Sequence, residues 1–308
     1  MASRADWFAI ATISGVGPAR IRTLLRAYGT LEEALAQPDE GLMGKNMLSE
    51  SQVAQLRKRL GRIEQIENML DDLDMDGIRL IPMDAEAYPP LLLTIASPPP
   101  VLFARGDPEC ANQRGVAIVG ARSASEEALE FAQALGASVA QAGLSVVSGL
   151  AAGVDAAAHV GCLEAGGVPV GVLGCGLSAV RQQVELCEDV AREGLLLSEL
   201  MPQTHATTAN LMARNRIVAG LARAVVAVAL GESQGTISTV RDARRQGRPL
   251  FLGPIAAATE SGREQVQAGV PVIEDPLDTA ALIEAARVYD PQSPEDELES
   301  GGQLRLFP

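Results

Sequence analysis

From residue 116 onward, short apolar runs alternate with stretches of helical spacing, and this alternation constrains the fold more than any other feature. The runs are continuously hydrophobic, as strands are when helices cover both faces of a parallel sheet. We therefore predict a doubly wound α/β domain with functional loops at the carboxyl ends of its strands. The predicted strands are Val116–Val119, Leu144–Val147, Pro169–Leu173, Leu195–Ser198, Ala224–Leu230 and Leu250–Gly253, and the predicted helices are 126–142, 153–166, 180–193, 207–222 and 236–247.

The N-terminal region has a different pattern, because helical spacing dominates it. Residues 7–36 predict helices broken once at Ser14-Gly15-Val16-Gly17-Pro18, which is a helix-hairpin-helix or SAM-like pattern. Such a glycine turn can hold a nucleic-acid phosphate on its backbone N–H groups, or it can simply let two short helices pack. Residues 49–75 predict one longer helix, with a basic cluster that we interpret as a solvated face: Arg57, Lys58, Arg59 and Arg62.

Two polar or proline-rich segments divide the chain into regions. The stretch from Tyr88-Pro89-Pro90 to Pro98-Pro99-Pro100 is typical of an extended connector. The segment Asp290–Gly302 is acidic and rich in Pro, Ser and Gly, so we expect disorder there. The predicted regions are a small helical domain over 1–80, the connector over 81–110, a Rossmann-like domain with a mostly parallel sheet over 111–288, and a disordered acidic tail with a terminal docking peptide over 289–308.

The charge balance first argues against a polyanionic partner. The chain has 25 Lys and Arg against 39 Asp and Glu, a net charge of −14. Binding depends on the local field, however, so an acidic average leaves room for one basic cleft. The Cys and His residues show no disulfide or metal-binding spacing. No signal peptide or long apolar run is present, so we expect a cytoplasmic protein with no metal and no membrane association.

A glycine turn follows the first predicted strand, with the sequence Gly120-Ala121-Arg122-Ser123. It opens a helix whose first turn carries Glu126 and Glu127. The backbone N–H groups of such a turn can hold a phosphate, and Arg122 can clamp it. The turn lacks the Gly-x-Gly-x-x-Gly spacing of dinucleotide-binding folds, so the sequence supports no dinucleotide site and we expect no cofactor.

The second predicted strand ends in Ser148-Gly149, and the helix after it begins near Gly153. The two glycines allow the backbone to approach a ligand closely. Asp155 and His159 are spaced i, i+4 and share one helix face. One Asp and one His without a nucleophile in register favour a structural or ligand-orienting role over acid–base catalysis, and Asp155 can equally cap the helix.

Arg214-Asn215-Arg216 is the best candidate anion site in the chain, because two Arg flank an Asn with few acids nearby. Residues two apart point in different directions on a helix, so the two Arg side chains would diverge unless the segment is a turn. A last loop, Glu232-Ser233-Gln234-Gly235-Thr236, supplies another glycine turn and a hydroxyl group before a helix.

These motifs, in this order, resemble the DprA/Smf family of DNA-processing proteins. The matching elements are the Val-Gly-x-Arg strand end, Ser-Gly-x-Ala-x-Gly-Val-Asp-x-x-Ala-His, and Arg-Asn-Arg-Ile-Val, with a similar connector at Tyr88–Asp107. The resemblance covers roughly residues 1–275. It implies a Rossmann-like protein, not an enzyme, that binds single-stranded DNA, forms a homodimer, protects incoming DNA during natural transformation and loads the RecA recombinase in DNA recombination.

The resemblance also implies a site, residue by residue. The DNA- or phosphate-binding residues would be Gly120, Arg122, Ser123, Ser148, Gly149, Arg214, Asn215, Arg216, Gly235 and Thr236, with Gly153, Asp155 and His159 shaping the pocket. The chain departs from the family pattern at Asn210-Leu211-Met212, where the family has Asn-Phe-Pro, and at Gln234-Gly235-Thr236, where it has Ser-Gly-Ser. The family's Tyr-Pro-Pro does not follow the third strand here, and we expect the C-terminal winged-helix domain of many members to be absent.

The position of the arginines changes the meaning of the net charge. Arg122, Arg214 and Arg216 all follow predicted strands, whereas much of the acid lies on helix faces and in the tail. We therefore predict a confined basic groove on an acidic body. Its DNA binding should be weaker and more salt-sensitive than that of a basic relative.

The end of the chain carries a second resemblance. Gln303-Leu304-Arg305-Leu306-Phe307 is similar to the Gln-Leu-x-Leu-Phe peptide by which bacterial replication and repair proteins dock on the DNA sliding clamp. A flexible tether would give such a peptide reach. The alternatives are an unrelated hydrophobic terminus and one that packs on its own fold. The residues of the clamp-like peptide are Gln303, Leu304, Leu306 and Phe307.

Two other functions stay open from the sequence. The same scaffold is similar to proteins that bind or hydrolyse nucleotides and their derivatives, for which an acid in the helix after Gly235-Thr236 would be needed. Asp242 is the only acid there, and it comes six residues after Thr236. The chain could also be a divergent adaptor that docks on the clamp and binds DNA weakly.

Overall fold

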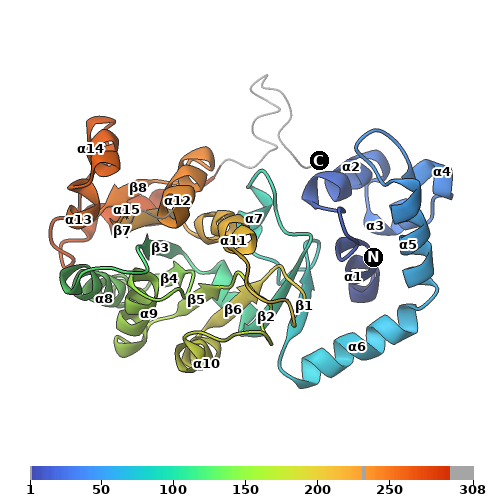
Figure 1. Cartoon of the computed structure of the whole chain (residues 1–308), viewed down its shortest axis with the longest axis horizontal. Coiled ribbons are helices and arrows are strands. Elements are labelled where there is room, and N and C mark those ends of the chain that lie inside the picture. Colours follow the sequence, from blue (N-terminus) through green and yellow to red (C-terminus); the bar gives the residue numbers. More distant parts are fainter. Residues whose placement is uncertain (1, 231–233, 292–308) are drawn as a thin grey trace. The chain divides into compact units, whose positions relative to one another are not determined.

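The computed structural model describes residues 2–230 and 234–291, and within them the chain forms two compact units (Figure 1). The first unit contains residues 2–88 and 96–103, and the second contains residues 89–95 and 104–291 apart from 231–233. The backbone therefore passes from the first unit to the second, returns, and passes again. No helix in the described residues is both long enough and apolar enough to cross a membrane.

The first unit is mostly helical, and its polar residues explain where several helices begin. Ser3, Thr30 and Ser49 each cap a helix with a side-chain oxygen, and each forms a capping box with an acid or amide three residues later. Large apolar side chains such as Trp7 and Leu24 fill its interior. The helices are α1 (Arg4–Ala11), α2 (Pro18–Tyr28), α3 (Leu31–Leu35), α4 (Asp39–Leu42), α5 (Glu50–Leu60) and α6 (Ile63–Met75).

The basic segment of α5 differs from the sequence prediction in two respects. The single helix expected over 49–75 is two helices, because α5 ends at Leu60 with Gly61 as its C-cap and α6 begins at Ile63. Arg57 and Arg59 are half-buried and donate hydrogen bonds to neighbouring loops and helices. Arg57 bonds to the Leu35 and Gln37 carbonyl oxygens and to Asp39, and Arg59 bonds to the Ala9 carbonyl oxygen and to Thr12. The interpretation as a solvated face was therefore wrong for these two arginines, although Lys58 and Arg62 are exposed.

Eight strands form the sheet, in the order β1-β2-β6-β5-β4-β3-β7-β8. All pairs from β6 to β8 along this order are parallel. Chain order reverses beside β3, which has β4 on one side and β7 on the other, as in a doubly wound sheet. The predicted α/β fold class is confirmed. The strands are β1 (Arg79–Pro82), β2 (Val101–Gly106), β3 (Gly115–Gly120), β4 (Ser145–Ser148), β5 (Pro169–Val172), β6 (Leu195–Ser198), β7 (Ala224–Ala229) and β8 (Leu250–Leu252).

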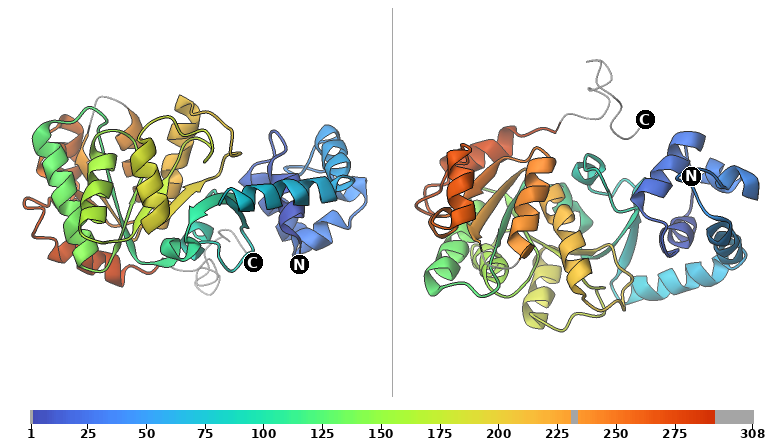
Figure 2. Two further views of the ribbon diagram at one scale, coloured as in Figure 1. Left: turned by 90° about the horizontal axis from the view of Figure 1, so that it is seen from below. Right: turned by 45° about the horizontal axis from the view of Figure 1, so that its top comes forward.

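Helices cover both faces of the second unit's sheet, with α8, α9 and α10 on one face and α11 and α12 on the other (Figure 2). Residues 81–110, predicted as a connector, contain α7, β2 and the start of a 3₁₀ helix. The helices are α7 (Pro90–Leu93), the 3₁₀ helix Pro108–Asn112, α8 (Glu126–Gln141), α9 (Val154–Glu164), α10 (Val184–Glu193), α11 (Thr208–Leu221), α12 (Gln234–Arg245), α13 (Pro254–Ala257), α14 (Glu260–Gln267) and α15 (Ala280–Val288).

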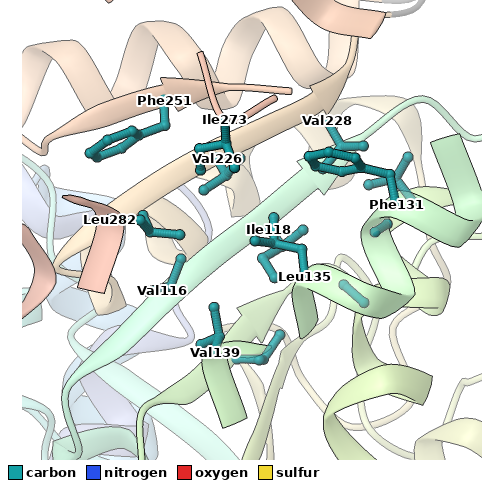
Figure 3. Close-up of a cluster of buried hydrophobic side chains, with 14 of the residues drawn as sticks. Val116, Ile118, Phe131, Leu135, Val139, Val226, Val228, Phe251, Ile273 and Leu282 are labelled. Carbon is teal, nitrogen blue, oxygen red and sulfur yellow. The ribbon is translucent and has the colours of Figure 1, made fainter. Parts of the chain in front are cut away.

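The main core of the second unit lies between the sheet and α8. Ile118 and Val226 of the sheet share a buried cluster with Leu135 and Val139 of α8 (Figure 3). Buried aliphatic side chains of this kind contribute about 1.5–3 kcal/mol each to the hydrophobic stabilisation of the folded state. This packing fixes β3, β4 and β7, and the candidate site lies at the carboxyl ends of β3, β4 and neighbouring β5.

Close approach of α8 and α9 requires a glycine at Gly161. A Cβ added there would lie 2.7 Å from the carbonyl carbon of Gln133 on α8. We expect Gly161→Ala to lower the free energy of unfolding by about 1–3 kcal/mol through overpacking, measured by urea denaturation followed by circular dichroism. Gly61→Ala is the matched control, because its added Cβ has ordinary contacts at 3.5 Å. Equal stability of the two variants would contradict the packing argument.

Candidate functional site

Two adjoining hollows lie at the carboxyl ends of β3, β4 and β5, and together we call them the strand-end groove. The first has a volume of about 340 Å³ and the second about 470 Å³. Arg122, Gly149, Ala151 and Leu211 line both hollows. The first is also lined by Gly120, Asp155, Arg214, Asn215, Gly235 and Thr236, and the second by Cys175, Arg181, Gln182 and His205. The loops after three different strands therefore meet in one groove, as the parallel sheet predicts.

Asp155, in the first turn of α9, ties the ends of two strands together. Its carboxylate accepts hydrogen bonds from the backbone N–H of Gly120 at 3.3 Å and of Gly149 at 3.1 Å. Burial raises the pKa of this carboxyl group, while Arg214 and the two amide donors act in the opposite direction. Both glycines line the first hollow, but their N–H groups donate to Asp155 and do not point to a ligand. Because they have no side chain, they still allow a ligand to come close to the backbone.

Arg214 lies beneath the strand ends with its guanidinium group against the backbone of Gly149. It is only 4% exposed, and an added Cβ at Gly149 would meet the guanidinium carbon at 2.5 Å. It donates a hydrogen bond to the carbonyl oxygen of Val172 at the end of β5. Its positive charge faces Asp155, which compensates the burial of both groups. The Nε atom is buried and has no hydrogen-bond partner among the described residues.

Arg122 and Arg181 supply exposed positive charge to the groove. Arg122 lines both hollows and Arg181 lines the second, and neither forms an ion pair within the described part of the chain. His205 is also exposed on the second hollow, whose lining contains no carboxylate. Sequence reasoning missed Arg181, because residues 180–183 were assigned to a helix that actually begins at Val184. The rule of functional strand ends, applied to β5, would have found it.

Arg216 points away from the groove. It forms a two-point ion pair with Glu199, with both N–O distances at 2.6 Å, and lines neither hollow. Arg214 and Arg216 lie on the regular helix α11, so their predicted divergence is confirmed. Asn215 between them turns inward and donates to the Gly235 carbonyl oxygen at 3.1 Å and to Ser238 at 2.7 Å. It thereby joins α11 to the start of α12, where buried Thr236 lines the first hollow.

The remaining residues of the second motif support the strands behind the groove. His159 is fully buried, and its Nε2 lies 3.3 Å from the Val170 carbonyl oxygen on β5. It lines neither hollow. Among the described residues, no hydrogen bond joins His159 to Asp155, so the two do not form an acid–base pair. Ser148 donates to the Ile118 carbonyl oxygen at 2.6 Å. Gly153 has φ of +91°, which lets the start of α9 reach the Ala121 carbonyl oxygen.

Two predicted sites remain outside this geometry. Ser123 is exposed and lines neither hollow. The clamp-like peptide of Gln303, Leu304, Leu306 and Phe307 lies outside the described residues, as do Glu232 and Ser233 of the loop before α12. Within the described residues, no group of three or more His, Cys, Asp or Glu side chains is placed to hold a metal ion.

The model of the family of DNA recombination-mediator protein A matches residues 79–282 of the chain. The chain is 31% identical to Protein Smf of Synechocystis over 82% of its own length and 64% of the relative's. It is 30% identical to Protein Smf of Escherichia coli, over 78% of its length and 66% of that relative's. It is 34% identical to DNA processing protein DprA of Bacillus subtilis, over 58% of its own length and 61% of that relative's. The chain thus spans less than two thirds of each of these relatives.

Two solved structures share the fold. DNA processing protein A from Streptococcus pneumoniae superposes with a TM-score of 0.75 and 23% identity, over 91% of this chain and 98% of that one. DNA processing protein A from Helicobacter pylori superposes with a TM-score of 0.60 and 23% identity, over 69% of this chain and 97% of that one. That structure describes a single-stranded DNA binding mode of the Helicobacter pylori protein. At this identity the likeness concerns the arrangement of the sheet and its helices.

The burial of His159 predicts how the free energy of unfolding depends on pH. Burial lowers the pKa of His159 from 6.5 to about 4, so the unfolded chain binds a proton there that the folded chain does not. Stability from this group is therefore present above pH 6.5 and is lost as the pH falls toward 4. Between about pH 7.5 and pH 5, we expect the wild type to lose about 2 kcal/mol of unfolding free energy relative to His159→Gln.

Urea denaturation of both proteins at several pH values checks this expectation. Titrating groups that are common to both proteins cancel in the difference. A constant difference for His159→Gln over the same pH range would show that the buried imidazole does not stay neutral in the folded state.

Proposed function

The chain belongs to the DprA/Smf family of DNA-processing, recombination-mediator proteins, and on that premise we propose that it binds single-stranded DNA along the strand-end groove. The observation that carries this proposal is the convergence of Arg122, Arg181 and Arg214 on adjoining hollows in a chain of net charge −14. The carboxylate of Asp155 faces Arg214 and two backbone amides. It therefore leaves the two exposed arginines free to attract phosphates.

The two kinds of arginine have different parts in this proposal. Arg122 and Arg181 are exposed and bind successive backbone phosphates, which gives an affinity that depends on salt and little on base sequence. Arg214 is part of the floor of the first hollow, beside the apolar side chains of Leu211 and Met212. A hollow of this size admits one unstacked base or nucleotide, which a base-paired duplex cannot present. Among the described residues no Phe, Tyr or Trp lines either hollow, so the imidazole of His205 on the second hollow is the aromatic ring there that a base can stack on.

Family membership supports a wider role for the same groove. We propose that bound single-stranded DNA is protected and then passed to the RecA recombinase, as part of natural transformation or another recombination pathway, by a homodimeric cytoplasmic protein. Docking of the clamp-like peptide on the DNA sliding clamp is part of the same proposal. We assign no catalytic step to Asp155 or His159, because backbone groups hold both side chains.

The nucleotide-hydrolase alternative has weaker support from the geometry. It requires an acid from α12 that faces the first hollow, and Asp242 lines neither hollow. Burial raises the pKa of Asp242, while Arg241, Arg245 and Arg216 lower it. A thermal-shift comparison of mononucleotides with a short oligonucleotide separates the two functions. We expect the oligonucleotide to stabilise the protein, and a response to mononucleotides alone would favour the alternative.

The groove assignment predicts which arginines matter for DNA. In the double variant Arg122→Ala and Arg181→Ala, affinity for a fluorescein-labelled oligothymidylate should fall roughly tenfold at moderate salt, because two phosphate contacts are lost. The slope of log affinity against log salt should become shallower by roughly 1.4, at about 0.7 per phosphate of a single strand. Fluorescence anisotropy titrations at several salt concentrations measure both quantities.

Arg216→Ala and Arg192→Ala are the matched controls. Each removes one arginine that pairs with an acid outside the hollows, with Glu199 and Asp189 respectively. We expect both to bind the oligonucleotide as the wild type does. An unchanged affinity in the double variant, or an equal loss in Arg216→Ala, would refute the groove assignment.

A further inference from the structure

A second cationic surface lies on α12, away from the strand-end groove. Arg241, Arg244 and Arg245 border a hollow of about 240 Å³, with apolar Ile237 and Val240 beside them and Gln265 of α14 opposite. We call these six residues the arginine groove. Its three arginines are exposed, and none forms a hydrogen bond or an ion pair with another described residue. Asp242 of the same helix interacts electrostatically with Arg241 and Arg245. It is the one acid of α12 against three arginines, so the helix has a local excess of positive charge.

The arginine groove is distinct from the proposed DNA site. Thr236 and Thr239 of the same helix line the first hollow of the strand-end groove, and no residue lines both surfaces. Helix geometry places Thr236 and Arg241 about 140° apart around the axis, at about 100° per residue. Cations in the last turn of a helix stabilise its dipole, which accounts for Arg244 and Arg245 but not for Arg241 or for the apolar floor.

The chain leaves the second unit beside the carboxyl end of this helix. Tyr289 donates from its hydroxyl group to the Gln246 carbonyl oxygen at 3.2 Å, and Arg248 donates to the same hydroxyl at 2.8 Å. Arg223 binds the Tyr289 carbonyl oxygen. The described residues end two positions later, at Pro291. Tyr289 therefore reaches the residue that follows Arg245, the last arginine of the groove, with its side chain.

We propose that the acidic segment 295–299 of the same chain docks in the arginine groove. Its sequence, Glu-Asp-Glu-Leu-Glu, has four carboxylates to pair with the three arginines and one leucine to lie on the apolar floor. An apolar floor with a cationic rim suits such a peptide better than a phosphate backbone, which has no apolar anchor. The docked segment covers the arginines of α12 and leaves the strand-end groove as the exposed cationic surface.

The tether is long enough, and its shortness favours docking. Residues 290–294 can extend about 17 Å. They start one tyrosine side chain away from Gln246, and Arg241 lies about 7.5 Å from Gln246 along the helix. A short linker between two binding partners gives an effective concentration on the order of 1 mM. If the intrinsic dissociation constant of the contact is about 0.2 mM, the docked form is then roughly five times as populated as the undocked form.

Arginine modification of the full chain tests the proposal. Phenylglyoxal labelling, quantified by mass spectrometry, should modify Arg244 and Arg245 roughly fivefold more slowly in the wild type than in the tail variant. The tail variant is Glu295→Gln, Asp296→Asn, Glu297→Gln and Glu299→Gln. The difference should disappear near 0.5 M salt, where exposed ion pairs are screened. Exposed Arg62 in the first unit is the internal reference for the reagent.

A matched control removes four exposed acids from the first unit and keeps the same net charge as the tail variant: Glu64→Gln, Glu67→Gln, Asp72→Asn and Asp84→Asn. It should label as the wild type does. Equal labelling of wild type and tail variant overturns the proposal. Protection that survives in the tail variant and grows with protein concentration identifies a second copy as the occupant, and protection that needs added oligonucleotide identifies DNA. Both results also overturn it.

Discussion

One buried carboxylate determines the shape of the strand-end groove. Asp155 joins the N–H groups of Gly120 and Gly149, and so connects β3, β4 and the first turn of α9. A buried charge is tolerated only where a partner and hydrogen bonds compensate it, and here Arg214 provides the opposite charge. Arg214 in turn reaches β5 through the Val172 carbonyl oxygen. Three strand ends and two helices are therefore positioned by two buried opposite charges and their hydrogen bonds to the backbone.

This arrangement divides the arginines by function. Arg214 is used inside the fold, Arg216 is neutralised by Glu199, and Arg122 and Arg181 remain exposed on the groove. A net charge of −14 is compatible with DNA binding in this arrangement, because the field in a groove depends on nearby charges rather than on the sum. The proposed docking of the acidic segment follows the same reasoning, since it pairs another group of arginines.

Much of the second unit was predictable, because its cues are local. Continuous apolar runs mark buried parallel strands, and a glycine turn after each of the first two marks a strand end, so β3, β4 and α9 lie within two residues of their predicted bounds. Arg181 escaped because its loop continues the helical pattern of residues 180–193, and Gln183 leaves that pattern only through a left-handed backbone at φ of +51°. A local pattern does not reveal such a conformation in a residue other than glycine.

The sequence by itself determined that Arg214 and Arg216 diverge if their segment is helical, that glycines stand at the strand ends, and that parallel strands bring those ends to one edge. These properties follow from backbone periodicity and the steric freedom of glycine. Only the tertiary structure decided which arginine faces the groove, that Asp155 occupies the amides of Gly120 and Gly149, and that Arg181 joins Arg122. The face of a helix that meets the sheet is set by packing between segments far apart in the chain, and local spacing contains no information about that choice.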